Sequence, residues 1–155
     1  MDWFAKAFVK ASLVWLGAGV TLGVAMAVHP SWEIYKPAHE HMNLLGFVTM
    51  MIFGIGYHVL PRIAGRPLYS PRIAGAHWFI ANAGLATMVA GFCLRVHTGT
   101  VSGGTVLLVV GGTLAALGAY AFIYNIWKTL DGLPHGITAR LNTAEVVPLQ
   151  RPSRQ

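Results

Sequence analysis

The stretch Met42–Leu60, MNLLGFVTMMIFGIGYHVL, contains no Asp, Glu, Lys or Arg and directly follows Pro37–His41, PAHEH. A transmembrane helix needs about 20 predominantly apolar residues at 1.5 Å each, so this stretch is long enough to cross a bilayer. Ionisable groups are costly at that depth and usually serve a cofactor, an ion or a proton. Neutral imidazole is also the commonest protein ligand for transition metals. The sequence therefore predicts a membrane protein built around histidine-bound metal.

The composition of the whole chain supports a membrane protein. Hydrophobic residues make up 55% of the 155 residues and charged residues only 10%, whereas soluble domains average about 25% charged residues. Three more uncharged stretches are each long enough to span a membrane: 11–28, 73–94 and 101–127. We therefore predict an all-α fold, an integral membrane four-helix bundle. The predicted spans are about 5–28, 38–60, 73–96 and 101–127, within a transmembrane domain of residues 1–128 that is followed by a tail of residues 129–155.

Basic residues are distributed unevenly between the two ends of the predicted bundle. Nine of the 11 Lys and Arg residues fall on one side of a four-span arrangement, and only Lys36 and Arg95 fall on the other. Because basic loops stay on the cytoplasmic side, we expect cytoplasmic N and C termini in a bacterial or archaeal cytoplasmic (inner) membrane. The net charge of +6 follows from this bias, so the expected partner is the lipid bilayer and no nucleic acid.

Six histidines fall at two depths of the predicted bundle. The second and third spans run in opposite directions, so His39 shares an outer level with His97, and His58 shares an inner level with His77. His29, at the end of the first span, also belongs to the outer level. A haem with two axial histidines needs ligands on different helices at matching depth, and each level can supply such a pair.

Within the PAHEH motif, the two imidazoles point in opposite directions. His39 and His41 are about 200° apart around a helix axis. They cannot bind one haem from both faces, but each can serve a different haem. Glu40, between them, either orients one imidazole or stays solvated at the membrane interface. The candidate ligands are therefore first His39 and His41, then His97 and His29, and last His58 and His77, of which the last four also fit ordinary interfacial histidines.

Small residues form a face on the first and the last predicted span. Such faces let helices approach closely, either within the bundle or between two chains of a homo-oligomer. Their members are Gly19, Gly23 and Ala27 on the first span and Gly111, Ala115 and Ala119 on the last.

A longer pattern resembles the tenth and eleventh helices of haem-copper oxidase subunit I, closest to its C-type oxidase and nitric oxide reductase branches. The matching segments are Ala38–His41, Gly46–Phe47, Phe53–Arg62, Gly65–Ser70, Ala76–Phe79 and Gly84. The chain looks like only the last four helices of that subunit. The resemblance implies that His39 is the proximal ligand of a high-spin haem and His41 an axial ligand of a low-spin haem. The helices that would supply the remaining ligands are not matched, so we expect no complete oxygen- or nitric-oxide-reducing centre in this chain.

These observations favour a b-type haem protein that carries electrons, with one or two haem b groups per chain or shared between chains. One alternative is a haem subunit of a larger oxidase or nitric oxide reductase-like respiratory complex, with quinol or cytochrome c as redox partner. Another is a haem or nitric oxide sensor, an assembly factor or a copper-binding membrane protein, because thioethers suit Cu(I) and the chain has six methionines. Whether the protein is an enzyme stays open.

The charge asymmetry predicts the topology. Reporter fusions placed after Lys10, Arg66 and Lys128 should report the cytoplasm, and a fusion after Lys36 should report the opposite side, because basic segments resist translocation. Paired alkaline phosphatase and fluorescent protein fusions measure this directly. An active phosphatase after Lys128 would contradict the prediction.

Overall fold

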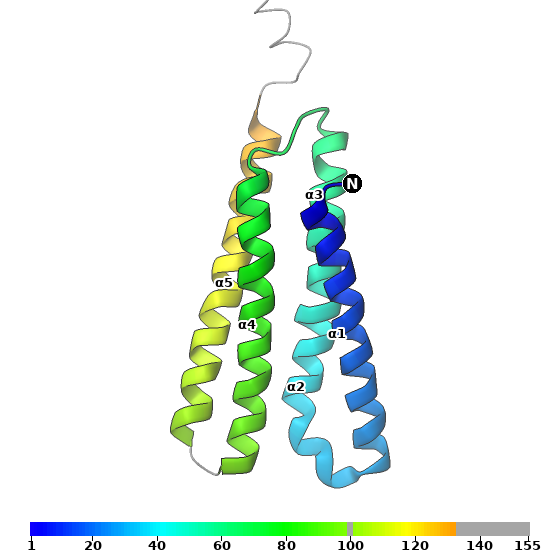
Figure 1. Ribbon diagram of the computed structural model, residues 1–155, viewed down its shortest axis with the longest axis vertical. Coiled ribbons are helices and arrows are strands. Elements are labelled where there is room, and N and C mark those ends of the chain that lie inside the picture. The colour runs from blue at the N-terminus through cyan, green and yellow to red at the C-terminus, as the bar shows by residue number, and fades with distance from the viewer. Residues whose placement is uncertain (99–100, 133–155) are drawn as a thin grey trace, which may run out of the picture.

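The computed structural model describes residues 1–98 and 101–132, and these residues are almost entirely helical, with no strand among them (Figure 1). The elements are α1 (Trp3–Val28), a 3-10 turn η1 (Pro30–Tyr35), α2 (Lys36–His41), a π-helical segment η2 (Met42–Thr49), α3 (Met50–Ile63), α4 (Pro71–Thr98) and α5 (Val101–Asp131). The predicted all-α, four-helix membrane fold is confirmed.

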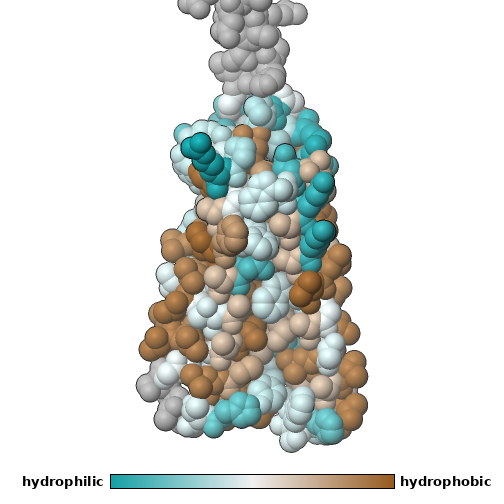
Figure 2. Space-filling model, in the orientation of Figure 1, coloured by the Kyte–Doolittle hydropathy of each residue, from teal (hydrophilic) through white to brown (hydrophobic). Residues whose placement is uncertain are grey.

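Four helical segments are long and apolar enough to cross a membrane: Trp3–Val28, Pro30–Ile63, Pro71–Thr98 and Gly103–Asp131. Figure 2 shows hydrophobic residues over the middle of the molecule and hydrophilic residues gathered toward its ends. Large apolar side chains such as Val14 on α1 and Val109 on α5 are exposed, as expected for helices that face lipid. Both ends of the described chain lie at the same end of the bundle (Figure 1), while the side of the membrane they face stays a prediction.

The helices form two hairpins, one of α1 with the continuous α2, η2 and α3 segment and the other of α4 with α5 (Figure 1). Glycines bring the backbones of α4 and α5 into contact. A Cβ at Gly84 would lie 2.8 Å from the backbone nitrogen of Ala115, and one at Gly111 would lie 2.6 Å from that of Met88. The small-residue face of the last helix is therefore used within the chain.

Aromatic rings join the two hairpins in the half of the bundle that contains the N-terminus. His77 of α4 lies between Phe8 of α1 and Phe53 of α3, with ring centroids 4.7 and 4.6 Å away. Phe122 of α5 lies 4.6 Å from Phe53 and 5.0 Å from Tyr57 of α3. Because aromatic side chains bury large areas, this cluster is a substantial apolar contact between the hairpins.

Polar side chains of α5 hold the loop between α3 and α4. The N–H of Ser70 donates to Oδ1 of Asn125 at 2.9 Å, and Nδ2 of Asn125 donates to the carbonyl of Ser70 at 2.8 Å. The hydroxyl of Thr129 accepts the N–H of Tyr69. Thr129 is buried and α5 continues to Asp131, so the first residues assigned to the tail belong to the last helix. The rest of the predicted tail, from residue 133, lies outside the described residues.

The glycine contact between α4 and α5 predicts a stability difference between two adjacent positions. Gly111→Leu should destabilise the bundle, by about 1–3 kcal/mol or more, because the new side chain collides with the α4 backbone. Gly112→Leu is the matched control, since a Cβ at Gly112 meets nothing within 4 Å. Thermal unfolding of both variants in detergent, followed by circular dichroism, measures the difference. Equal stability of the two variants would contradict this packing.

Candidate functional site

His39 is seated in a recess on α1. Its Nδ1 lies 2.8 Å from the carbonyl oxygen of Gly19 and 3.3 Å from Nδ2 of Asn43. A carbonyl can only accept, so the shorter contact assigns the proton to Nδ1. A Cβ at Gly23 would lie 2.7 Å from Cε1 of His39, so the ring fits only because position 23 is glycine. Asn43 covers Gly19 and donates to the His39 carbonyl at 2.9 Å. Nε2 of His39 is left as the nitrogen with a free lone pair.

His41 faces α4 instead. Its Nδ1 lies 2.7 Å from the carbonyl oxygen of Pro37, one turn earlier, so Nδ1 again carries the proton. Its ring packs against Phe92 of α4, with centroids 4.9 Å apart. The two imidazoles of the motif therefore contact different helices, as their predicted opposite directions require.

The imidazoles of His39 and His41 both donate Nδ1–H to a backbone carbonyl, which is an arrangement that suits metal binding. In metal sites, a histidine usually donates its other N–H to a carbonyl or carboxylate, which fixes the ring and makes the ligating nitrogen more basic. Backbone carbonyls, and not Glu40, provide this orientation for His39 and His41. Glu40 is exposed between them. Within residues 1–98 and 101–132, no three His, Cys, Asp or Glu side chains are close enough to share a metal ion.

A cavity lies beside each imidazole at this end of the bundle. The first, of about 300 Å³, lies between the end of α1 and η1 and is lined by His39 itself. The second, of about 330 Å³, is lined by Pro37 and Phe92, the two residues that hold His41. Lys36 lines the first cavity and Arg95 the second. His39 thus lines one cavity directly, while the second cavity is lined by the neighbours of His41.

The second-choice ligands of the outer level have other partners. Nε2 of His97 lies 2.6 Å from the hydroxyl of Tyr35, and the ring of His29 packs on Trp32 at 5.5 Å. Both histidines are exposed at helix ends. Neither makes a ring contact or a hydrogen bond with His39, so the outer level holds four histidines, His41 included, without pairing them.

The inner-level histidines line neither of these two cavities. His77 is fully buried with its Nδ1 3.0 Å from the hydroxyl of Tyr57. A Cβ at Gly118 would lie 3.1 Å from Cδ2 of His77, so the ring is packed tightly against α5. Nδ1 of His58 accepts a hydrogen bond from Arg62. This geometry makes His77 a core residue of the aromatic cluster.

The methionines are dispersed rather than gathered around one point. Met50 is buried in the core, Met51 lies 3.9 Å from the Ser12 hydroxyl of α1, and Met88 packs against Gly111 of α5. This arrangement lends no support to the copper alternative.

The sequence did not indicate the π-helical segment that follows the motif. η2 has eight residues, and the Thr49 hydroxyl donates to the Leu44 carbonyl five residues earlier, at 2.8 Å. A Cβ at Gly46 would lie 2.6 Å from Cβ of Trp15 on α1, so the wide turns fit closely against that helix. π-helical turns occur frequently at functional sites. Their backbone pattern has no simple residue signature. Asn43 was not singled out from the sequence either, and its spacing of four residues from His39 on a helix is the signal that could have found it.

Comparison with known proteins places this geometry in a wider context. No protein-family model matches the chain. The chain is 28% identical over 143 residues to a protein named cytochrome c oxidase subunit 1 from Rhodobacter capsulatus, covering 77% of this chain and 26% of that protein. It is 25% identical over 155 residues to a cbb3-type cytochrome c oxidase subunit CcoN1 from Stutzerimonas stutzeri, covering 80% of this chain and 32% of that protein. The chain thus spans between a quarter and a third of the length of these curated relatives. The two similarities confirm the relationship to haem-copper oxidase subunit I that the sequence suggested.

Proposed function

We propose that this protein is a membrane haem protein that binds haem iron through Nε2 of His39 and Nε2 of His41 and carries electrons. The observation that supports this function best is the shared state of the two imidazoles, each of which donates Nδ1–H to a backbone carbonyl. That state leaves a neutral Nε2 for iron, the usual arrangement of a metal-bound histidine.

The residues around His39 fit a ligand role. Gly19 and Gly23 form a recess that accepts the imidazole and the Asn43 amide, and no larger residue would leave this space. The recess holds the ring in one orientation before any ligand binds, which lowers the entropic cost of coordination. Bound haem would supply one-electron chemistry, and the chain's own residues would hold its iron and shield it from water.

We expect that the described residues of one chain do not complete the coordination by themselves. His39 and His41 face different helices and different cavities, and the other outer histidines, His97 and His29, contact Tyr35 and Trp32 instead. We infer that at least one haem lies at an interface, where a second copy of this chain or another subunit of a respiratory complex supplies the opposite ligand. Both relatives are named as oxidase subunits, which supports assembly in such a complex.

We also propose the membrane in which the protein lies and its redox partners. Four membrane-length helices and the oxidase relatives support a multi-pass membrane protein. We place it in a bacterial or archaeal inner membrane, with quinol or a cytochrome c as electron donor or acceptor. The small-residue faces do not add to the case for a homo-oligomer, because Gly19 and Gly111 pack within the chain.

Haem binding should depend on the motif histidines. His39→Ala and His41→Ala should each remove a large part of the haem absorbance, because loss of an axial imidazole opens the coordination of the iron. His58→Ala is the control, since that imidazole lies at the other level and contacts Arg62. A visible spectrum and a pyridine haemochrome assay on protein purified from haem-replete cells measure the content. Wild-type protein without a Soret band would refute haem binding.

Haem binding should also depend on the recess on α1 that holds the His39 imidazole. Gly23→Val should lower the haem content several-fold, because the added Cβ would lie 2.7 Å from the His39 ring and displace it. Gly17→Val, on the same helix, is the control, because a Cβ at Gly17 meets nothing within 4 Å. The haem-to-protein ratio and the unfolding temperature of both variants are measured together. Equal haem content would show that His39 is not held there for coordination.

The interface can be tested through the coordination state. Detergents that dissociate the assembly should convert six-coordinate haem to a five-coordinate form or release it. Light scattering gives the mass of the particle, and the visible spectrum gives the coordination. A monomer that keeps full bis-histidine coordination, and loses it in His97→Ala, would show that one chain completes the site.

A further inference from the structure

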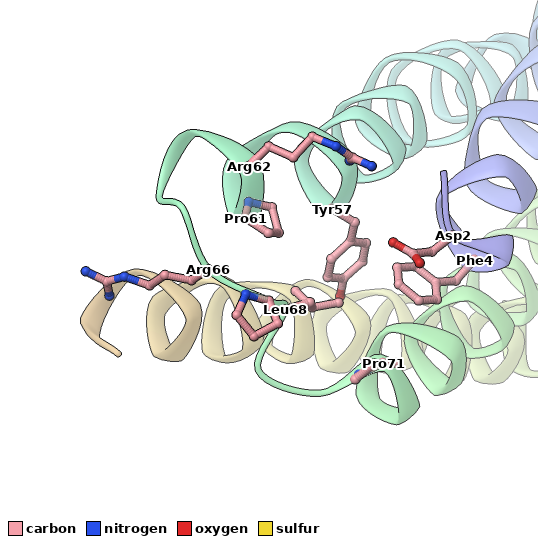
Figure 3. A pocket seen from close by; sticks show the side chains of 9 residues that line it. Asp2, Phe4, Tyr57, Pro61, Arg62, Arg66, Leu68 and Pro71 are labelled. Atoms are coloured by element: carbon pink, nitrogen blue, oxygen red, sulfur yellow. The ribbon is translucent and has the colours of Figure 1, made fainter. Parts of the chain in front are cut away.

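A cavity of about 310 Å³ lies at the end of the bundle opposite to His39, and it belongs to no part of the proposed haem site (Figure 3). It lies between the first turn of α1, the last turn of α3 and the loop that leads to α4. Its walls carry two arginines, Arg62 and Arg66, and one carboxylate, Asp2. Phe4 and Leu68 contribute apolar surface. The spans begin and end here, so the cavity lies where the membrane meets water.

Asp2 is free to bind a ligand in this cavity. It occupies the N-cap position of α1, where an aspartate side chain ordinarily accepts a backbone N–H of the first turn. Here the side chain makes no such hydrogen bond, and Figure 3 shows the carboxylate turned toward Phe4 and Tyr57 at the cavity wall. The aspartate is therefore not used for helix capping.

Arg62 presents a fixed positive charge to the same cavity. One of its terminal nitrogens bonds to Nδ1 and to the carbonyl of His58, one turn earlier, which anchors the guanidinium. Figure 3 shows its side chain extended along α3 above Tyr57, with Asp2 approaching from α1. Within residues 1–98 and 101–132 the two side chains form no ion pair, so each keeps hydrogen-bonding capacity for a third group. Arg66 is directed away, toward the last carbonyls of α5.

We propose that this cavity binds the head group of a phospholipid that carries both a phosphate and a primary ammonium, a phosphoethanolamine group. Arg62 binds the phosphate by charge-assisted hydrogen bonds, and Asp2 accepts hydrogen bonds from the ammonium. A trimethylammonium group has no N–H to donate, and a phosphoglycerol group has no cation for Asp2. The Asp2 carboxylate therefore selects phosphatidylethanolamine over phosphatidylcholine and phosphatidylglycerol, while Arg62 binds the phosphate that all three lipids carry.

The size and surroundings of the cavity fit a head group attached to a lipid. A volume of about 310 Å³ lies at the lower limit of ordinary ligand pockets, so the acyl chains remain outside. Trp3 and Ile63, the neighbours in sequence of the lining residues Phe4 and Arg62, are 57% and 78% exposed. Both belong to the helix turns that border the cavity and expose apolar surface at this end of the bundle, where acyl chains can lie.

The test compares three lipids with identical acyl chains bound to the full-length protein in detergent, by native mass spectrometry and by thermal shift. Phosphatidylethanolamine should bind about tenfold more tightly than the other two, since each charged contact is worth about that factor. Asp2→Asn should abolish the preference, whereas Arg62→Gln should weaken the binding of all three lipids, because all three carry the phosphate. Arg72→Gln and Asp131→Asn are the matched controls, because both residues are exposed at the same end and neither lines the cavity.

Other outcomes would overturn the proposal. Equal binding of all three lipids by the wild-type protein refutes it without any variant, so a variant that fails to fold does not weaken the test. Phosphatidylglycerol bound most tightly, with Asp2→Asn silent, would indicate an anionic-lipid site. Soluble glycerophosphoethanolamine bound as tightly as the lipid would refute a membrane source. A preference for phosphatidylethanolamine that survives Asp2→Asn would place the lipid elsewhere.

Discussion

The hydrogen bond from His39 Nδ1 to the Gly19 carbonyl is the contact on which the candidate site depends. An imidazole that donates to a helix carbonyl must come very close to that helix, and the absence of a side chain at Gly23 permits this approach. The bond fixes the tautomer, the ring orientation and the separation of α1 from α2. Asn43 then fills the space above Gly19 and continues the contact into η2.

The π-helical segment gives the second helical span an irregular middle. Its wide turns pack Gly46 against Trp15 directly after the motif, while His41 turns to Phe92 on α4. The motif thus links the two hairpins at the end opposite to the N-terminus, as the aromatic cluster around His77 links them at the other. Two imidazoles held on opposite sides of one helix cannot share one iron, which is the physical reason for proposing a partner chain.

Glycine and small residues have one consistent use in this fold. They let polar or backbone groups of neighbouring helices touch, as Gly23 does for His39 and Gly111 does for the α4 backbone. The sequence identified these faces correctly as sites of close approach. It could not say which helix approaches, because a stripe of small residues carries no information about its partner. The structure assigns both faces to contacts within the chain.

Hydropathy alone determined the number and approximate extent of the spans, because any chain segment in lipid must satisfy its backbone hydrogen bonds internally and so forms a helix. Helical periodicity also determined that His39 and His41 diverge. Only the tertiary structure decided which ring nitrogen of His39 and of His41 is free. It also decided that His97 bonds to Tyr35 and that His77 is a core residue. These outcomes depend on the neighbour that each side chain meets across a helix interface, and local sequence does not encode that choice.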